Sequence, residues 1–143
     1  MISFLTREPL LARFFAALLI FIASFLPFVP DAAILIMPDT VSAQTESLTV
    51  TFKNNTNREL AFMPDYYVER KTEDGWERCG FREGSGVNEI IIQLPPFTGS
   101  ELNVELSQLA QPLRPGTYRL VKNYTSAASA AREYSAYAEF EVT

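Results

Sequence analysis

Residues 48–53 read Leu-Thr-Val-Thr-Phe-Lys, and their side chains alternate between apolar and polar. A period of two is typical of a β-strand that buries one face and leaves the other in water. The same alternation returns in residues 102–106, Leu-Asn-Val-Glu-Leu, and in residues 138–142, Ala-Glu-Phe-Glu-Val. Three such stretches in a short chain predict a β-sheet protein.

Turn residues divide the rest of the chain, after its first 43 residues, into further short segments. The turn signals are residues 54–57 (Asn-Asn-Thr-Asn), 74–75 (Asp-Gly), 84–86 (Gly-Ser-Gly) and 95–96 (Pro-Pro). Between them we find no convincing helix, so we predict an all-β sandwich or barrel of about seven or eight antiparallel strands. The expected strands are residues 48–53, 59–62, 66–71, 76–81, 87–94, 101–106, 117–124 and 134–142.

The composition limits the classes of function. The chain has 143 residues, which is room for one domain, and its 12 Lys and Arg face 17 Asp and Glu for a net charge of −5. An acidic, mixed surface offers no footprint for phosphates, so we expect no nucleic acid partner. The chain has no histidine, which removes the commonest general base and the imidazole metal ligands. We therefore expect no catalytic residues, no metal and no cofactor.

The single cysteine, Cys79, cannot form a disulfide within the chain. A sandwich built from this sequence must therefore be held together by packing alone. A lone cysteine is usually a small buried apolar residue rather than a reactive thiol, and we expect the same of Cys79.

The beginning of the chain differs in composition from the rest. Two arginines precede an apolar run over residues 14–26, as in the charged and apolar regions of an export signal. Residues 41–43, Val-Ser-Ala, offer a cleavage site that would release a secreted domain, whereas an uncleaved run would anchor the chain to the membrane. We therefore predict a signal peptide or signal anchor with a short linker over residues 1–43, built on a hydrophobic helix. An extracytoplasmic domain would then span residues 44–143.

Residues 113–122, Leu-Arg-Pro-Gly-Thr-Tyr-Arg-Leu-Val-Lys, carry a resemblance to a known family. Pro115 and Gly116 turn the chain, and Tyr118 can fold back so that its hydroxyl bonds to an upstream backbone group, as in a tyrosine corner. With these features the chain resembles the bacterial immunoglobulin-like domains of exported and membrane-anchored proteins. The resemblance implies an immunoglobulin-like β-sandwich that serves as a binding or structural module. Further matching features lie in residues 67–69, 74–76 and 138–140.

A segment near the end of the chain offers a candidate interaction loop. Residues 123–133 are rich in Ala and Ser and join the last two expected strands at one end of the sandwich. Loops at such ends often carry recognition, and tyrosines supply broad contact at low entropic cost. The alternative is a mobile connection with no role in binding. The candidate binding residues are Asn123, Tyr124, Arg132 and Tyr134.

Other residues are expected to have structural roles. Trp76 could anchor a ligand, but as the largest apolar residue after a hairpin turn it is expected to pack between the sheets. Phe140 is expected to point into the core. The full set of expected structural residues is Trp76, Pro115, Gly116, Tyr118 and Phe140.

Two basic residues of the next-to-last strand, Arg119 and Lys122, could form a small basic spot. We expect instead that Arg119 pairs with Glu139 or Glu141 across the last hairpin. Such a cross-strand pair contributes only about 0.2–1 kcal/mol.

These inferences lead to one main hypothesis about function. The chain is expected to be a non-catalytic extracytoplasmic module that contacts a protein or another component of the cell envelope, with its N-terminal segment in the membrane if uncleaved. The alternative is a small exported protease inhibitor that presents a Pro-rich or Ala-rich loop to an enzyme cleft. An enzyme using Asp or Glu alone would need two carboxylates about 5–10 Å apart in a cleft, and nothing in their spacing supports one.

Overall fold

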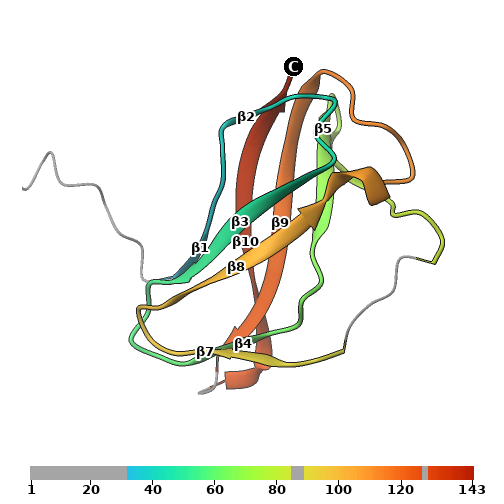
Figure 1. Cartoon of the computed structure of the whole chain (residues 1–143). Helices are drawn as coiled ribbons and strands as arrows, with labels where there is room; N and C mark the ends of the chain where they lie inside the picture. Colours follow the sequence, from blue (N-terminus) through green and yellow to red (C-terminus); the bar gives the residue numbers. More distant parts are fainter. Residues whose placement is uncertain (1–31, 85–88, 127–128) are drawn as a thin grey trace, which may run out of the picture.

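The alternating stretches of the sequence form the strands of a β-sandwich (Figure 1). The computed structural model describes residues 32–84, 89–126 and 129–143. In these residues a short 3₁₀-helix, η2 (Leu106–Gln108), accompanies ten strands. The strands are β1 (Ala33–Ile36), β2 (Thr40–Val41), β3 (Ser47–Asn54), β4 (Leu60–Phe62), β5 (Tyr67–Thr72), β6 (Gly75–Cys79), β7 (Ile92–Leu94), β8 (Gly99–Glu105), β9 (Gly116–Ser126) and β10 (Ser129–Val142).

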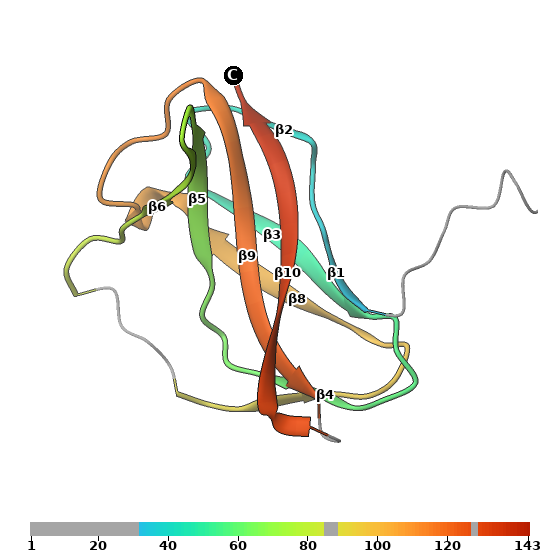
Figure 2. The ribbon, with the colours of Figure 1, turned by 180° about the vertical axis from the view of Figure 1, so that it is seen from behind.

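The strands form two sheets. The smaller sheet has the order β1-β3-β8, and the larger sheet has the order β2-β10-β9-β4-β7, with β5 also paired to β9 and β6 paired to β5. Strand β9 is long enough to pair with β5 near its beginning and with β4 at its end, because β4 and β5 follow each other along the same edge. Figure 1 shows β3 and β8 running obliquely across β9 and β10, and Figure 2 views the larger sheet from behind.

All eight strands expected from the sequence are present, although their ends differ by a few residues. The largest difference concerns the strand expected over residues 87–94, of which only β7 is a strand in the described part of that range. The strand expected over residues 76–81 ends at Cys79, and Phe81 beyond it forms an isolated bridge with Leu109. The prediction of an all-β sandwich is confirmed.

Two strands precede Gln44, where the sequence analysis placed the start of the domain. Strand β1 pairs with β3, and β2 pairs in parallel with the end of β10, so the sandwich is not entirely antiparallel. Ala33, Leu35 and Val41 are buried in the core. Residues 32–43 are therefore part of the sandwich and not a linker. Their strands are short and β1 lacks a clear alternation, which is why the sequence pattern did not reveal them.

The hydrophobic helix expected at the beginning of the chain falls mainly on residues 1–31, which lie outside the described residues. Within the described residues, no helix has the length and apolar character needed to cross a membrane.

The core lies between the two sheets and is rich in aromatic rings. Phe52 of β3 is fully buried, and its ring centroid lies 4.9 Å from that of Phe62 and 5.7 Å from that of Tyr124. Phe62 and Tyr124 belong to the larger sheet, so these contacts join the two layers. Cys79 is a free, half-buried thiol that packs against the core, and burial raises its pKa, which disfavours the reactive thiolate.

The sandwich has two ends, which we call the entry end and the far end. At the entry end, where the described chain begins at Ala32, lie the turns over residues 54–59 and 95–98, the end of β9 and the beginning of β10. The backbone N–H of Asn55 donates to the carbonyl of Ala32 at 3.3 Å, and that of Asn54 donates to the carbonyl of Thr98 at 2.8 Å. The far end carries the β5–β6 hairpin and the C-terminus (Figures 1 and 2).

Candidate functional site

Four neighbouring strands of the larger sheet, β6, β5, β9 and β10, have one face in the core and the other on the outside of the sandwich. Residues paired across strands share a face. Tyr67, Val121 and Tyr137 form one such row across three strands, and Glu69, Arg119 and Glu139 form the next. Neither row contributes a side chain to the central core. We call this exposed side of the larger sheet the outer face; Figure 2 shows β5, β9 and β10 side by side, and β6 pairs with β5.

Arg119 is the centre of a cluster on the outer face. Its guanidinium carbon lies 4.3 Å from the ring centroid of Trp76 and 4.4 Å from that of Tyr137. Its Nε also donates a hydrogen bond to Oε1 of Glu69 at 2.7 Å. A guanidinium held between two ring faces and a carboxylate is fixed in orientation.

A second stacked pair lies beside the first. The guanidinium carbon of Arg78 lies 3.8 Å from the ring centroid of Tyr67. Val121 is completely buried although it is on the outer face, because its row neighbours Tyr67 and Tyr137 flank it. Tyr137 itself is 52% exposed. We call Tyr67, Trp76, Arg119 and Tyr137 the outer-face cluster.

The structure corrects the expected environments of Trp76, Arg119 and Lys122. Trp76 is half-buried and does not pack between the sheets. It pairs with Lys71 across the β5–β6 hairpin, and both residues lie on the outer face. Arg119 pairs with Glu69, its neighbour in β5, and not with an acidic residue of β10. Lys122 is fully buried, so it forms no basic spot with Arg119.

The candidate interaction loop is largely a β-hairpin. Strand β9 continues to Ser126 and β10 begins at Ser129, with an irregular pairing between Ser129 and Glu133. The two strands therefore run further into the Ala- and Ser-rich segment than the sequence suggested. Little of the expected loop is therefore left as a loop in the described residues.

The four candidate residues of this hairpin have different environments. Tyr124 is buried, its hydroxyl accepts a hydrogen bond from the Ala33 N–H at 3.4 Å, and its ring stacks on Tyr134 with centroids 5.6 Å apart. Arg132 lies over the Tyr134 ring at 5.2 Å. Asn123 accepts a hydrogen bond from the Ser135 hydroxyl at 2.7 Å and faces outward. The structure thus brings Tyr124, Arg132 and Tyr134 together, and it places Asn123 apart from them.

The expected tyrosine corner is present. The Arg114 backbone N–H donates to the hydroxyl of Tyr118, four residues downstream, at 3.1 Å. The Tyr118 ring is buried and stacks on Phe140, with centroids 5.8 Å apart, so both residues lie in the core as expected. Gly116 has a φ of +154°, and a Cβ there would lie 3.5 Å from the Arg70 guanidinium. These residues are structural and fix the start of β9.

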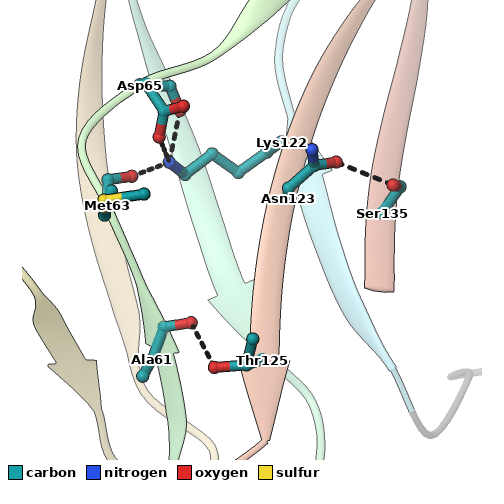
Figure 3. Close-up of polar contacts among 7 residues, drawn as sticks. All are labelled: Ala61, Met63, Asp65, Lys122, Asn123, Thr125 and Ser135. Carbon is teal, nitrogen blue, oxygen red and sulfur yellow. Dashed lines mark hydrogen bonds and ion pairs between the residues drawn. The ribbon is translucent and has the colours of Figure 1, made fainter. Parts of the chain in front are cut away.

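Lys122 closes a gap in the larger sheet (Figure 3). It lies where the neighbour of β9 changes from β5 to β4, and its ammonium donates to the backbone carbonyls of Met63 and Asp65 in the β4–β5 connection. The carboxylate of Asp65 is 3.8 Å away. Burial lowers the pKa of Lys122 to about 8, and the Asp65 charge partly offsets this effect. This role was not predictable from the sequence, since an isolated lysine in a strand usually faces water.

The described residues offer no sign of metal chemistry, since no three His, Cys, Asp or Glu side chains gather among them to hold an ion. The outer-face cluster gathers aromatic rings and an arginine on an exposed face of the larger sheet. Of these residues, Tyr67 and Tyr137 were not predicted as site residues, and Arg119 was considered only for a basic spot or a cross-strand ion pair. The available signal was the alternation within each strand, which places large side chains on the outward positions of β5, β9 and β10.

Three solved structures that resemble the chain have low sequence identity to it. The PapD-like domain 7 of human CEP192 is 11% identical, with a TM-score of 0.40 and coverage of 82% of this chain and 89% of that domain. The CsuC–CsuE chaperone–tip adhesion subunit complex of Acinetobacter baumannii is 13% identical, with a TM-score of 0.44 over 78% of this chain and 56% of that one. The DNA glycosylase AlkC of Pseudomonas fluorescens is 12% identical, with a TM-score of 0.36 over 77% of this chain and 29% of that one. None of these likenesses carries a functional argument.

Sequence comparison is more informative about the family. No curated protein matches the chain. The model of the bacterial Ig-like domain family matches residues 31–141, a range that includes β1 and β2 as well as the strands expected from the sequence. Because this match covers most of the chain, the protein belongs to the bacterial Ig-like domain family.

Proposed function

We propose that this chain is a non-catalytic, extracytoplasmic module that binds a protein or another component of the cell envelope through its outer-face cluster. The observation that carries the proposal is the Arg119 guanidinium held between the rings of Trp76 and Tyr137 on an exposed sheet face. Trp, Tyr and Arg dominate the binding energy of protein interfaces. Side chains that are already ordered lose little entropy on binding, which favours this cluster as the centre of an interface.

The extracytoplasmic location is supported by the sequence of the N-terminal segment, in which arginines precede the apolar run over residues 14–26. Cleavage after Ala43 would remove β1 and β2, and with them the core residues Leu35 and Val41. We therefore propose that the mature chain keeps residues 32–43. The N-terminal segment then serves as an anchor or is cleaved before Ala32.

The protease inhibitor alternative has less support. In the described residues most of its Ala-rich loop belongs to β9 and β10, with an irregularity between Ser129 and Glu133, so it offers little extended segment to an enzyme cleft. No observation on the Pro-rich segment before Gly116 favours inhibition over a connecting role. The outer-face cluster, by contrast, is exposed and ordered, as a binding surface requires.

Binding measurements with matched variants test the proposed surface. The full chain, purified in detergent, would be titrated with solubilised envelope fractions, and any captured component would then be titrated in purified form. Arg119→Ala and Tyr137→Ala should each weaken saturable binding at least about tenfold, as expected for residues at the centre of an interface. Asn103→Ala changes an exposed residue on the other sheet and should leave binding unchanged. Full binding by both cluster variants would exclude this surface.

Location is tested separately. Protease added to intact spheroplasts should digest the domain if it lies outside the cytoplasmic membrane, and a cytoplasmic marker should survive. A domain that becomes accessible only after lysis would contradict the extracytoplasmic part of the proposal, independently of the binding result.

A further inference from the structure

A turn at the entry end exposes an aromatic side chain in an unfavourable backbone conformation. Phe97 lies between β7 and β8, and it is 67% exposed. Its φ is +57°, in the left-handed region that a bulky residue rarely adopts. Such strain persists only where the surrounding structure enforces it, and it is common at sites of function.

Asn54 enforces the conformation of this turn. Asn54 is fully buried, and its side-chain amide donates to the carbonyls of Leu94 and Pro95, each at 3.1 Å. Its backbone N–H donates to the carbonyl of Thr98 at 2.8 Å, and the hydroxyl of Thr98 donates to the carbonyl of Pro95 at 2.7 Å. The turn is therefore held on both sides of Phe97, which keeps the ring in solvent.

The same asparagine organises the neighbouring turn at the entry end. Its amide also donates to the Arg58 carbonyl at 2.7 Å, and its side-chain oxygen accepts hydrogen bonds from the Thr56 N–H at 2.9 Å and the Thr56 hydroxyl at 2.6 Å. Both turns are thus tied to one buried side chain. The entry end presents a rigid surface with Phe97 projecting from it.

The chain reaches the sandwich at this end. In the sequence the apolar residues 14–30 are separated from Ala32 by Asp31 alone. If residues 14–30 are held in a membrane, one residue of spacer brings the entry end to the lipid surface. The described residues of the far end, including the β5–β6 hairpin, would then point away from the bilayer.

We propose that the entry end rests on the membrane and that Phe97 inserts into the interface between lipid headgroups and acyl chains. This inference rests on the form of the proposed function in which the N-terminal segment stays attached as a membrane anchor. An apolar ring such as that of phenylalanine can be buried at the boundary between headgroups and acyl chains, and an ordered turn loses little entropy when it inserts. The charges on and beside the two turns are mixed, since Lys53 pairs with Gly99 and the neighbouring turn carries Arg58 and Glu59, so insertion does not require anionic lipid.

Fluorescence quenching in vesicles tests the proposal. The full chain carries a single tryptophan, Trp76, so the double variant Trp76→Phe, Phe97→Trp carries its only tryptophan at position 97. Both proteins would be reconstituted into phosphatidylcholine vesicles with and without brominated acyl chains. Brominated lipid should remove most of the emission of the variant, and its spectrum should shift to the blue.

The unmodified chain is the matched control. Trp76 contacts Arg119, which precedes Ser126 at the entry end by seven residues of β9, or roughly 23 Å at 3.3 Å per residue. Its emission should therefore be unaffected by brominated lipid. If circular dichroism shows that the double variant with Phe97→Trp is misfolded, a second double variant, Trp76→Phe with Asn57→Trp, places the only tryptophan on the exposed neighbouring turn instead.

The outcomes separate this inference from the proposal it rests on. A chain that floats with the vesicles while its entry-end tryptophan stays unquenched would refute membrane contact and leave the anchor intact. A chain that does not float with vesicles would refute both the anchor and the contact. Equal quenching of Trp76 would show that the domain lies flat on the bilayer and would also overturn the proposed orientation.

Discussion

Lys122 is a buried cation whose neighbours are mainly backbone carbonyls, and this makes its contribution to stability depend on pH. Its pKa is about 8 in the folded protein, below the ordinary value of 10.5. Between these values the unfolded state binds more protons than the folded state, so stability rises with pH. We expect the free energy of unfolding to increase from pH 8 to about 9.5, by at most about 1.4 kcal/mol per pH unit. Urea denaturation over this range measures the effect.

The variant Lys122→Met identifies the source of this dependence. It should remove the rise above pH 8. At pH 7 it should lower the free energy of unfolding by about 1–3 kcal/mol, because the carbonyls of Met63 and Asp65 lose their donor. Lys53→Met changes an exposed lysine and should keep the pH dependence of the wild type. A Lys122→Met protein with an unchanged pH profile would show that another group titrates.

The hydroxyl of Tyr118 makes a single hydrogen bond that can be removed without disturbing its ring. Tyr118→Phe leaves the Arg114 N–H without its acceptor but keeps the stack on Phe140. We expect a loss of about 1 kcal/mol, the usual net value of such a bond. Thermal denaturation checks this, and a loss several times larger would mean that the ring itself has shifted.

Strand β1 shows how one element can be essential to the sandwich although its sequence pattern is weak. Its neighbouring residues Leu35 and Ile36 provide a matched pair, since Leu35 is buried and Ile36 is 49% exposed. Leu35→Ala should cost about 2 kcal/mol or more, because it leaves a cavity in the core. Ile36→Ala should stay within about 0.5 kcal/mol of the wild type. Chemical denaturation of both variants distinguishes an integral strand from a loosely attached one, for which both changes would be small.

The two sheets depend on each other because they share one aromatic core. Phe52 of the smaller sheet contacts Phe62 and Tyr124 of the larger one, so Phe52→Ala should destabilise the whole sandwich by about 3–5 kcal/mol. For both the wild type and Phe52→Ala, far-ultraviolet circular dichroism and the fluorescence of Trp76 in the larger sheet should report the same single unfolding transition. Separate transitions for the two probes would show that the sheets unfold independently.

Local alternation and turn residues together were sufficient to predict eight strands and the all-β class, because a strand with one buried face has a period of two in adjacent residues and turn residues mark its ends. The corner at Tyr118 was predictable for a similar reason, since its partner Arg114 is only four residues away. Both features depend on residues that are close in the chain.

Tertiary structure alone decided which strands became neighbours, and that determined the environment of each side chain. Arg119 could have met Glu139 from β10, but it is held by Glu69 and Trp76 of strands about fifty and forty residues earlier. Lys122 is buried because β9 changes its neighbour at that point, and β1 is a strand because the edge of β3 was open to pair with it. Alternation specifies a face for each residue but not the partner strand, so these contacts had no signature in the local sequence.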